Sequence, residues 1–271
     1  MIAAALSAIL LSAGPQFEAA ASAGGGYDSN PNNADPSLSS LGSGFMALRA
    51  SGGVSMDVGE RSNVYAGVRF DDEEYPSFPD LTTRTVGGDL SLVQELGART
   101  ALVVTPWIAR SWSGDPGRDA TTWAAQLTLR VKPVRELALR ASYAYKDRNA
   151  SNDLFSSISN RVGASAEWRL LPRTYLSAAA SVERGDEVFY RAVTAGGGTG
   201  GMGGRVGAGS GTRTADQPYK EMATTWAFGP ALEVGLGSGV YLLGNYEVRW
   251  IEGTTTNMRT QSVFAAVGAR R

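Results

Sequence analysis

Four consecutive carboxylates, Asp71, Asp72, Glu73 and Glu74, are the residues whose types and spacing most resemble a metal site. Oxygen ligands of this kind suit a hard cation such as calcium. Neighbouring side chains on an extended chain point in alternating directions, so the four carboxylates would not all turn toward one ion. We therefore expect a solvated loop at this position and assign no metal site.

The chain contains neither histidine nor cysteine among its 271 residues. This excludes a disulfide framework, Cys/His zinc sites, haem ligation through either residue, and Ser-His or Cys-His nucleophilic catalysis. The 25 basic and 26 acidic residues give a formal charge of -1, without a long basic run. Nucleic-acid binding relies on the neutralisation of phosphates, so we expect no nucleic-acid partner. We also expect no enzymatic activity and no cofactor, and we assign no catalytic residue.

Alternation of apolar and polar residues is the dominant pattern along the chain. In residues 121–132 (TTWAAQLTLRVK), Leu127 and Leu129 share one face, whereas Thr128 and Arg130 share the other. A period of two places alternate side chains on opposite faces of a β-strand. No stretch of comparable length shows a convincing helical period, and 34 residues are glycine. The sequence therefore predicts an all-β protein.

Twelve such runs are predicted as strands, near residues 17–29, 43–57, 62–74, 84–95, 99–112, 120–132, 136–147, 158–169, 173–185, 219–235, 239–251 and 259–270. The breaks alternate between short turns, such as Gly97-Ala98, and longer polar loops, such as SGDPGRD. An even number of strands with this alternation is typical of bacterial outer-membrane barrels. We predict a closed antiparallel transmembrane β-barrel of about 12 strands, with short periplasmic turns and long extracellular loops.

The pattern resembles that of the outer-membrane β-barrel proteins of Gram-negative bacteria, over essentially the whole mature length. The opening GGGYDSNPN, Gly24 to Asn32, is similar to the first strand and surface loop of barrels in polysaccharide-export and other envelope machines. The resemblance implies a location in the bacterial outer membrane, in contact with outer-membrane lipid and lipopolysaccharide. The enzymatic barrels of the phospholipase A, omptin and lipid A palmitoyl transferase types use histidine, which this chain lacks.

Aromatic residues on the apolar faces are expected to form girdles at the two membrane interfaces, where an apolar ring and a polar tip are both satisfied. The predicted girdle consists of Trp123, Tyr143, Tyr145, Trp168, Trp226 and Trp250. Trp168 lies beside a short turn, and the other five are placed at strand ends next to long loops. In the alternative structure, a soluble β-sandwich, these rings would fill the core.

The polar faces of the strands become the barrel interior and carry a mixed but mostly basic set of charges. The predicted lumen-lining charged residues are Arg69, Asp89, Arg130, Arg140, Lys146, Arg161, Glu167, Arg169, Glu233, Glu247 and Arg249. Two alternatives remain open for this set. The charges could form ion pairs that plug the lumen, or they could line a water-filled channel whose basic surplus favours anionic solutes.

The chain is expected to form one barrel domain, residues 14–271, after a signal peptide in the apolar, uncharged residues 1–13. Residues 185–218 include AGGGTGGMGGRVGAGSGT and are predicted to be a long Gly-rich surface loop. Pro106 and Pro230 lie inside predicted strands, where we expect a bulge or a break because proline cannot donate to the ladder.

Several outward faces are poor in bulky side chains, notably at Ala178, Ala180, Ala265, Val267 and Ala269. Close packing against another protein rewards small residues, whereas lipid does not. We therefore favour a non-enzymatic structural or anchoring subunit of a trans-envelope machine, such as one for polysaccharide export or surface gliding motility, with envelope proteins as partners. The alternative is a passive, porin-like diffusion channel with a basic lumen for small anionic solutes or oligosaccharides.

Overall fold

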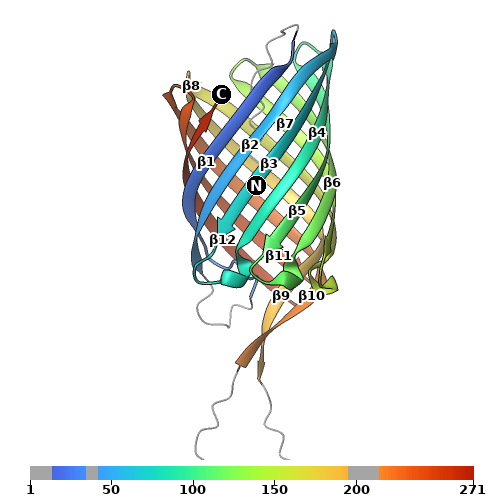
Figure 1. Ribbon diagram of the computed structural model, residues 1–271, viewed down its shortest axis with the longest axis vertical. Coiled ribbons are helices and arrows are strands. Elements are labelled where there is room, and N and C mark those ends of the chain that lie inside the picture. Colours follow the sequence, from blue (N-terminus) through green and yellow to red (C-terminus); the bar gives the residue numbers. More distant parts are fainter. Residues whose placement is uncertain (1–13, 35–41, 195–213) are drawn as a thin grey trace, which may run out of the picture.

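Twelve antiparallel strands close into a single barrel (Figure 1). The computed structural model describes residues 14–34, 42–194 and 214–271, with the backbone alone for 191–194 and 214–217. Each strand pairs with the next in sequence, and β1 pairs with β12. The strands are β1 (Gln16–Asp28), β2 (Ser43–Gly59), β3 (Ser62–Glu74), β4 (Thr83–Gly97), β5 (Thr100–Ser113), β6 (Ala120–Val134), β7 (Leu137–Ala150), β8 (Ser157–Leu171), β9 (Thr174–Thr194), β10 (Thr214–Gly237), β11 (Val240–Gly253) and β12 (Asn257–Arg270). The closed antiparallel barrel predicted from the sequence is confirmed.

The two ends of the barrel differ in their connections. At one end, which we call the turn end, two-residue turns join the strands, and β1 begins and β12 ends there. The opposite end, the loop end, carries the longer connections and three short 3-10 helices, η1 (Pro79–Leu81), η2 (Pro116–Arg118) and η3 (Asp153–Phe155). Among the residues described, no helix combines the length and hydrophobicity needed to cross a membrane.

Strand alternation gives the barrel an apolar outer surface. Leu127 and Leu129 are 45% and 40% exposed, whereas the intervening Thr128 faces the interior and is half-buried. A soluble protein would bury such side chains, but a transmembrane barrel turns them toward lipid. The outward apolar residues include Leu48, Val68, Leu90, Leu92, Val104, Ile108, Leu139, Val162, Leu176, Phe228, Leu232, Leu242 and Val267.

The predicted loop at 185–218 is partly strand. β9 continues to Thr194 and β10 starts at Thr214, so the two strands extend past the barrel wall as a hairpin (Figure 1). Beyond the ladders with β8 and β11, their ends pair with each other from Asp186–Met222 to Thr194–Thr214, and Tyr190 also forms a bridge with Ala34. Residues 195–213, which hold the most Gly-rich part of that loop, and the expected signal peptide at 1–13 lie outside the described residues.

The bulge or break expected at Pro106 and Pro230 is not found. Both prolines lie inside continuous strands, and the pairing has the same register before and after each of them. Each proline removes a donor on one side of its strand only, and there the paired rungs are interrupted. On the other side both prolines keep their partners, Ala125 and Ala178, so the strand remains intact.

Gly26 of β1 provides room for two aromatic rings at the seam where the barrel closes. Gly24 and Gly26 face inward, and the rings of Phe45 (β2) and Phe264 (β12) stack at 5.9 Å with an interplanar angle of 4°. A Cβ atom on Gly26 would lie 2.6 Å from Cζ of Phe45. Rings from the two flanking strands therefore occupy the space that side chains of β1 would otherwise fill.

We expect Leu129→Arg to destabilise the barrel by about 2–4 kcal/mol, because it places a charge on the lipid-facing surface. Thr128→Arg adds the same charge one residue away, on the inner face, and should have little effect. Urea unfolding of the barrel in lipid vesicles measures both changes. Equal damage from the two substitutions would contradict this assignment of faces.

The glycine seam gives a second prediction for stability. Gly26→Ala should cost about 1–3 kcal/mol, because the new methyl group would clash with the backbone oxygen of Val263 and with the Phe45 ring. Gly244→Ala in β11 is the matched control, since a Cβ atom there has nothing within 4 Å. The same unfolding assay compares them, and a Gly26 variant as stable as the Gly244 variant would rule out the proposed packing.

Candidate functional site

The inner wall of the barrel is lined by small side chains over β7–β10. Ten small residues that point inward from the middle of these strands are half-exposed: Ser142, Ala144, Gly163, Ser165, Ser177, Ala179, Ser181, Ala227, Gly229 and Ala231. An eight-stranded barrel is just wide enough for its side chains to fill, and twelve strands enclose a larger interior. The small lining residues leave space for water in the lumen.

Strand alternation places all eleven predicted lumen-lining charges on the inner face. They are distributed over β3, β4, β6, β7, β8, β10 and β11 and are not gathered in one cluster: Arg69, Asp89, Arg130, Arg140, Lys146, Arg161, Glu167, Arg169, Glu233, Glu247 and Arg249. Arg69 lies over the ring of Trp107 at 4.4 Å. The site is therefore a charged wall and not a single constellation.

Further inward charges were not identified from the sequence, and most of them are acidic. These are Glu18, Asp28, Arg49, Asp57, Asp71, Glu73, Lys132, Arg148, Glu183, Glu187, Glu221 and Arg270. With them included, the inner wall does not carry the basic surplus that we expected. Asp71, Glu73 and Glu187 lie near strand ends, at positions where the sequence analysis expected a loop.

The carboxylates Asp71 to Glu74 illustrate this correction, because they belong to β3 and not to a solvated loop. Asp71 faces inward, 3.7 Å from Arg49, whereas Asp72 faces outward, 3.4 Å from Arg84. Their side chains alternate as expected. Within the described part of the chain, no group of three or more carboxylates is placed to hold a metal ion.

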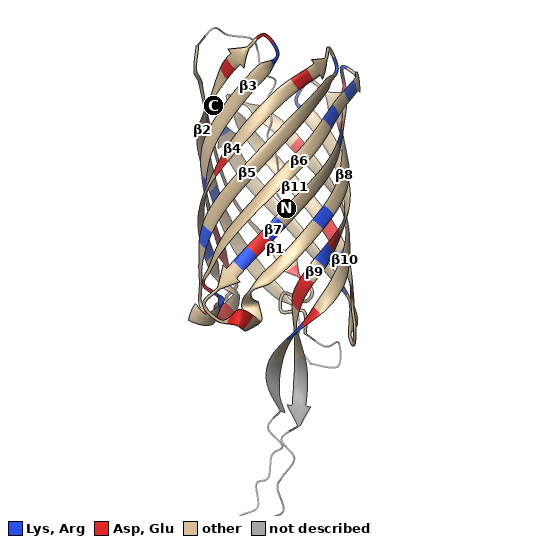
Figure 2. Ribbon diagram, turned by 90° about the vertical axis from the view of Figure 1, so that its right-hand side faces the viewer, with Lys and Arg blue, Asp and Glu red and all other residues tan. Residues whose placement is uncertain are grey.

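The charges are segregated around the barrel. The inner face of β6–β8 is basic and carries Arg130, Lys132, Arg140, Lys146, Arg148, Arg161 and Arg169 with the acidic residue Glu167. The inner face of β1–β4, which runs from the strand opposite β7 to a strand two places from β6, carries Glu18, Asp28, Asp57, Asp71, Glu73 and Asp89 with Arg49 and Arg69. Charged residues occur along the strands as well as at both ends (Figure 2). Separate basic and acidic sectors of this kind create an uneven electric field inside the lumen.

The ion pairs of the inner wall lie along it and do not cross the lumen. Lys146 of β7 contacts Glu183 of β9 at 2.9 Å, and Arg270 of β12 contacts Glu233 of β10 at 2.8 Å. The other inward pairs among the described residues also join groups on the same strand, on neighbouring strands, two strands apart, or on a strand and an adjacent turn. The alternative in which ion pairs plug the lumen is therefore not supported.

Arg130 and Arg140 form a like-charged rung of the basic wall. They are direct partners in the β6–β7 ladder, an arrangement that is destabilising unless the charges are compensated. Arg140 Nη2 donates to Oε2 of Glu167 at 3.3 Å. The Nε atoms of both arginines are buried and have no hydrogen-bond partner. The rung therefore retains unsatisfied donors and positive charge inside the lumen.

The start of the first long loop crosses part of the loop-end mouth. Ala34 forms a parallel bridge with Tyr190 of β9, and Asn33 Nδ2 donates to Oε1 of Glu187 at 2.7 Å. Asn30 holds the loop by two hydrogen bonds to the backbone of Ala34. The loop thus passes over β12, β11 and β10 and narrows the mouth on that side.

A second contact at the loop end fixes the connection after β3. Tyr75 donates a hydrogen bond to Oε1 of Glu73 at 2.7 Å, and its ring packs against Phe45. Burial, followed by the charge of Glu73, raises the pKa of Tyr75 well above its usual value. The hydroxyl therefore keeps its proton and its bond to Glu73.

The predicted girdle residues all lie on the outer face. Trp123, Trp226 and Trp250 lie toward the loop end, and Trp226 and Trp250 are ladder partners. Trp168 lies toward the turn end and is 55% exposed.

Tyr143 and Tyr145 differ in depth. Tyr145 packs against Trp123, with ring centroids 5.3 Å apart. Tyr143 lies in the middle of β7 and not at a strand end as expected. Its hydroxyl donates to Oδ1 of Asn160 at 2.6 Å, which satisfies the polar tip away from the interface.

No protein-family model and no curated protein matches the sequence. Similar solved structures include an outer-membrane channel from Pseudomonas putida F1, with a TM-score of 0.60, 9% identity and 97% of each chain covered. The KdgM porin in complex with disordered oligogalacturonate has a TM-score of 0.48 at 7% identity, and covers 92% of this chain and 98% of its own. The translocator domain of the autotransporter NalP from Neisseria meningitidis has a TM-score of 0.44 at 13% identity, with 96% and 89% covered.

At these identities the comparisons concern the fold alone. The closed ladder of twelve strands, the short turns at one end and the apolar outer surface are the features of proteins that span the outer membrane. The chain therefore has the fold of the bacterial outer-membrane β-barrels, whose location is the outer membrane.

Proposed function

We propose that the protein is a passive diffusion channel for small polar and charged solutes. The observation that carries this proposal is the inner wall of β7–β10, whose small side chains are half-exposed inside the barrel. The ion pairs along the wall support the channel proposal, because the paired side chains neutralise one another beside the wall and do not fill the centre of the lumen. This favours the channel over the anchoring role that the sequence had suggested.

The segregated charges give the proposed channel its selectivity. An anionic group is attracted to the β6–β8 wall, where Arg130 and Lys132 have no ion-pair partner among the described residues. A cationic group is attracted to the mostly acidic inner face of β1–β4. The field therefore orients solutes that carry both signs of charge and disfavours apolar solutes. Anionic solutes gain from the basic wall even though the whole lumen has no basic surplus.

An anchoring subunit of an envelope machine is the second candidate, and one observation favours it. Two outward rungs of the closing seam carry only small residues, with Ala21 paired to Ala269 and Gly25 paired to Ala265. Such a surface allows another protein to pack closely. Chemical crosslinking in intact outer membranes, followed by purification of the barrel, tests whether a partner occupies this seam.

Single-channel recording in planar bilayers tests the channel directly. The purified barrel should give discrete, ohmic conductance steps, because a water-filled lumen passes ions without a transport cycle. Folding is checked separately by the altered gel mobility of unheated samples. A folded barrel that is silent in these recordings would overturn the channel proposal.

Ion selectivity tests the contribution of the two walls. Arg130→Ala combined with Arg140→Ala should lower the ratio of anion to cation permeability, on the order of twofold, because positive charge leaves the basic wall. Glu18→Gln combined with Asp89→Asn should shift the ratio in the opposite direction. Reversal potentials in a salt gradient measure both shifts. Identical shifts from the two double variants would contradict the segregated-wall assignment.

A further inference from the structure

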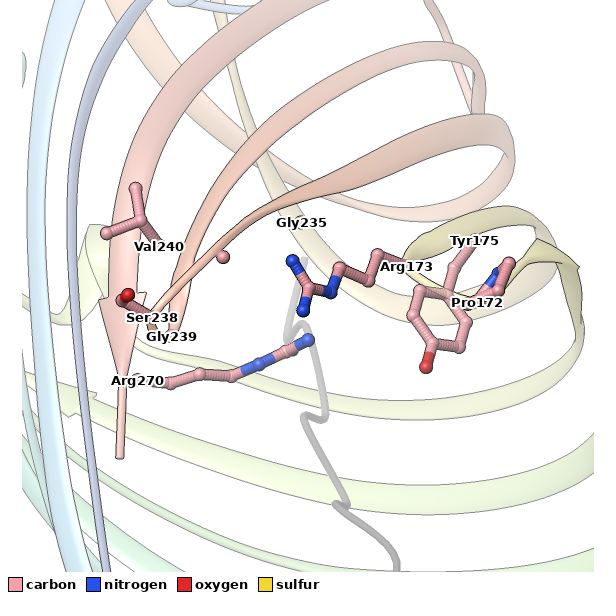
Figure 3. Close-up of a pocket in the computed structure, with 9 residues that line it drawn as sticks. Pro172, Arg173, Tyr175, Gly235, Ser238, Gly239, Val240 and Arg270 are labelled. Carbon is pink, nitrogen blue, oxygen red and sulfur yellow. The ribbon is translucent and has the colours of Figure 1, made fainter.

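A cavity of about 220 Å³ lies on the inner side of the turn end (Figure 3). It is bounded by the β8–β9 turn, the β10–β11 turn and the end of β12. Pro172, Arg173 and Tyr175 contribute one side, and Arg270 contributes the other. The two guanidinium groups point toward one another across the cavity (Figure 3).

Arg270 is held in place by two contacts. Its Nη2 donates to Oε1 of Glu233 at 2.8 Å, and its guanidinium carbon lies 5.2 Å from the centroid of the Tyr241 ring. A guanidinium has five N–H donors, so one bond to Glu233 leaves others for a ligand. The position of this side chain is therefore set before any ligand arrives.

Arg173 is not engaged in this way. Its side chain has no hydrogen bond or ion pair to any residue that the structure describes, and its backbone oxygen accepts from the N–H of Gly235 at 2.7 Å. Together with Arg270 and Glu233 it gives the cavity a net charge of about +1. Two guanidiniums with one carboxylate form an incomplete arrangement that an anion would complete.

Glycines keep the cavity open. A Cβ atom on Gly235 would lie 3.2 Å from Cβ of Arg173, and one on Gly237 would lie 3.1 Å from its Nη1. Gly237, Ser238 and Gly239 all have positive φ, which shapes the tight β10–β11 turn at the rim. Side chains at positions 235 and 237 would intrude on the space beside Arg173.

We propose that this cavity binds the phosphate or carboxylate group of a small solute, held between Arg173 and Arg270. Planar guanidiniums suit this task because they donate paired hydrogen bonds to such oxyanions. Tyr175, which also lines the cavity, supplies a hydroxyl donor. The volume is several times the share of one water molecule in the liquid, which suits one anionic group and a few attached atoms. The site goes beyond the channel proposal, since binding here does not require that solutes cross the lumen.

Calorimetric titration of the detergent-solubilised barrel with inorganic phosphate, at constant ionic strength, tests the site. Wild type should show saturable binding, and Arg173→Gln should weaken it about tenfold through the loss of charge-assisted hydrogen bonds. Arg61→Gln is the matched control, because Arg61 occupies an exposed turn at the same end and does not line the cavity. Gly235→Val fills the cavity without removing charge, and it should abolish the saturable binding of phosphate.

The outcomes distinguish specific binding in this cavity from nonspecific attraction of anions by the barrel, and they test the cavity independently of the channel proposal. Equal weakening by Arg173→Gln and Arg61→Gln, or unchanged binding in Arg173→Gln, would overturn the proposal. A parallel titration with acetate distinguishes carboxylate from phosphate, and the absence of saturable binding for both anions in the wild type would also overturn it. The titration measures no transport, so a barrel that conducts without binding phosphate or acetate refutes this site alone. A barrel that binds but does not conduct refutes the channel alone.

Discussion

Closure of the backbone hydrogen-bond ladder between β1 and β12 is the constraint on which the rest of the structure depends. Inside a bilayer no water is available to unpaired N–H and C=O groups, so an open sheet edge is not tolerated. The pairing runs from Ala20–Arg270 to Asp28–Ser262 and makes every strand an interior strand. Closure divides each strand into a lipid face and a lumen face, so a two-residue sequence period gives a barrel with an apolar outside and a charged inner wall.

The sequence predicted the two faces well, because alternation is local. The opposite orientations of Leu129 and Arg130 follow from position alone once a strand is assumed. The extension of β9 and β10 to Thr194 and Thr214 was not predictable in this way, because it depends on pairing between segments separated by a Gly-rich stretch. The sequence also could not show that β5 continues through Pro106. This depends on the register of β5 with its neighbouring strands β4 and β6, which is defined only in the closed barrel.

For the inner wall, too, the local sequence predicted which way side chains point but not which residues they contact. The predicted charges face inward, but their balance was misjudged because acidic residues near strand ends, such as Asp71 and Glu73, were assigned to a loop. Their partners depend on register between strands: Lys146 meets Glu183 two strands away, although 37 residues separate them in sequence. Spatial segregation is a property of strand order around the circumference, and the sum of the charges does not reveal it.

The ion pairs along the wall also explain where function can reside. A charge that is paired with a neighbouring strand stabilises the wall and contributes little to a passing solute, whereas an unpaired charge remains available to it. Arg140, Lys146 and Arg270 are of the first kind. Arg130, Lys132 and Arg173 have no ion-pair partner among the residues described, and they lie near the turn end on the inner side of the barrel. Glycines at 235 and 237 prevent neighbouring side chains from covering Arg173. Solute interactions are therefore expected to concentrate near the turn end, on the charges that closure of the barrel left uncompensated.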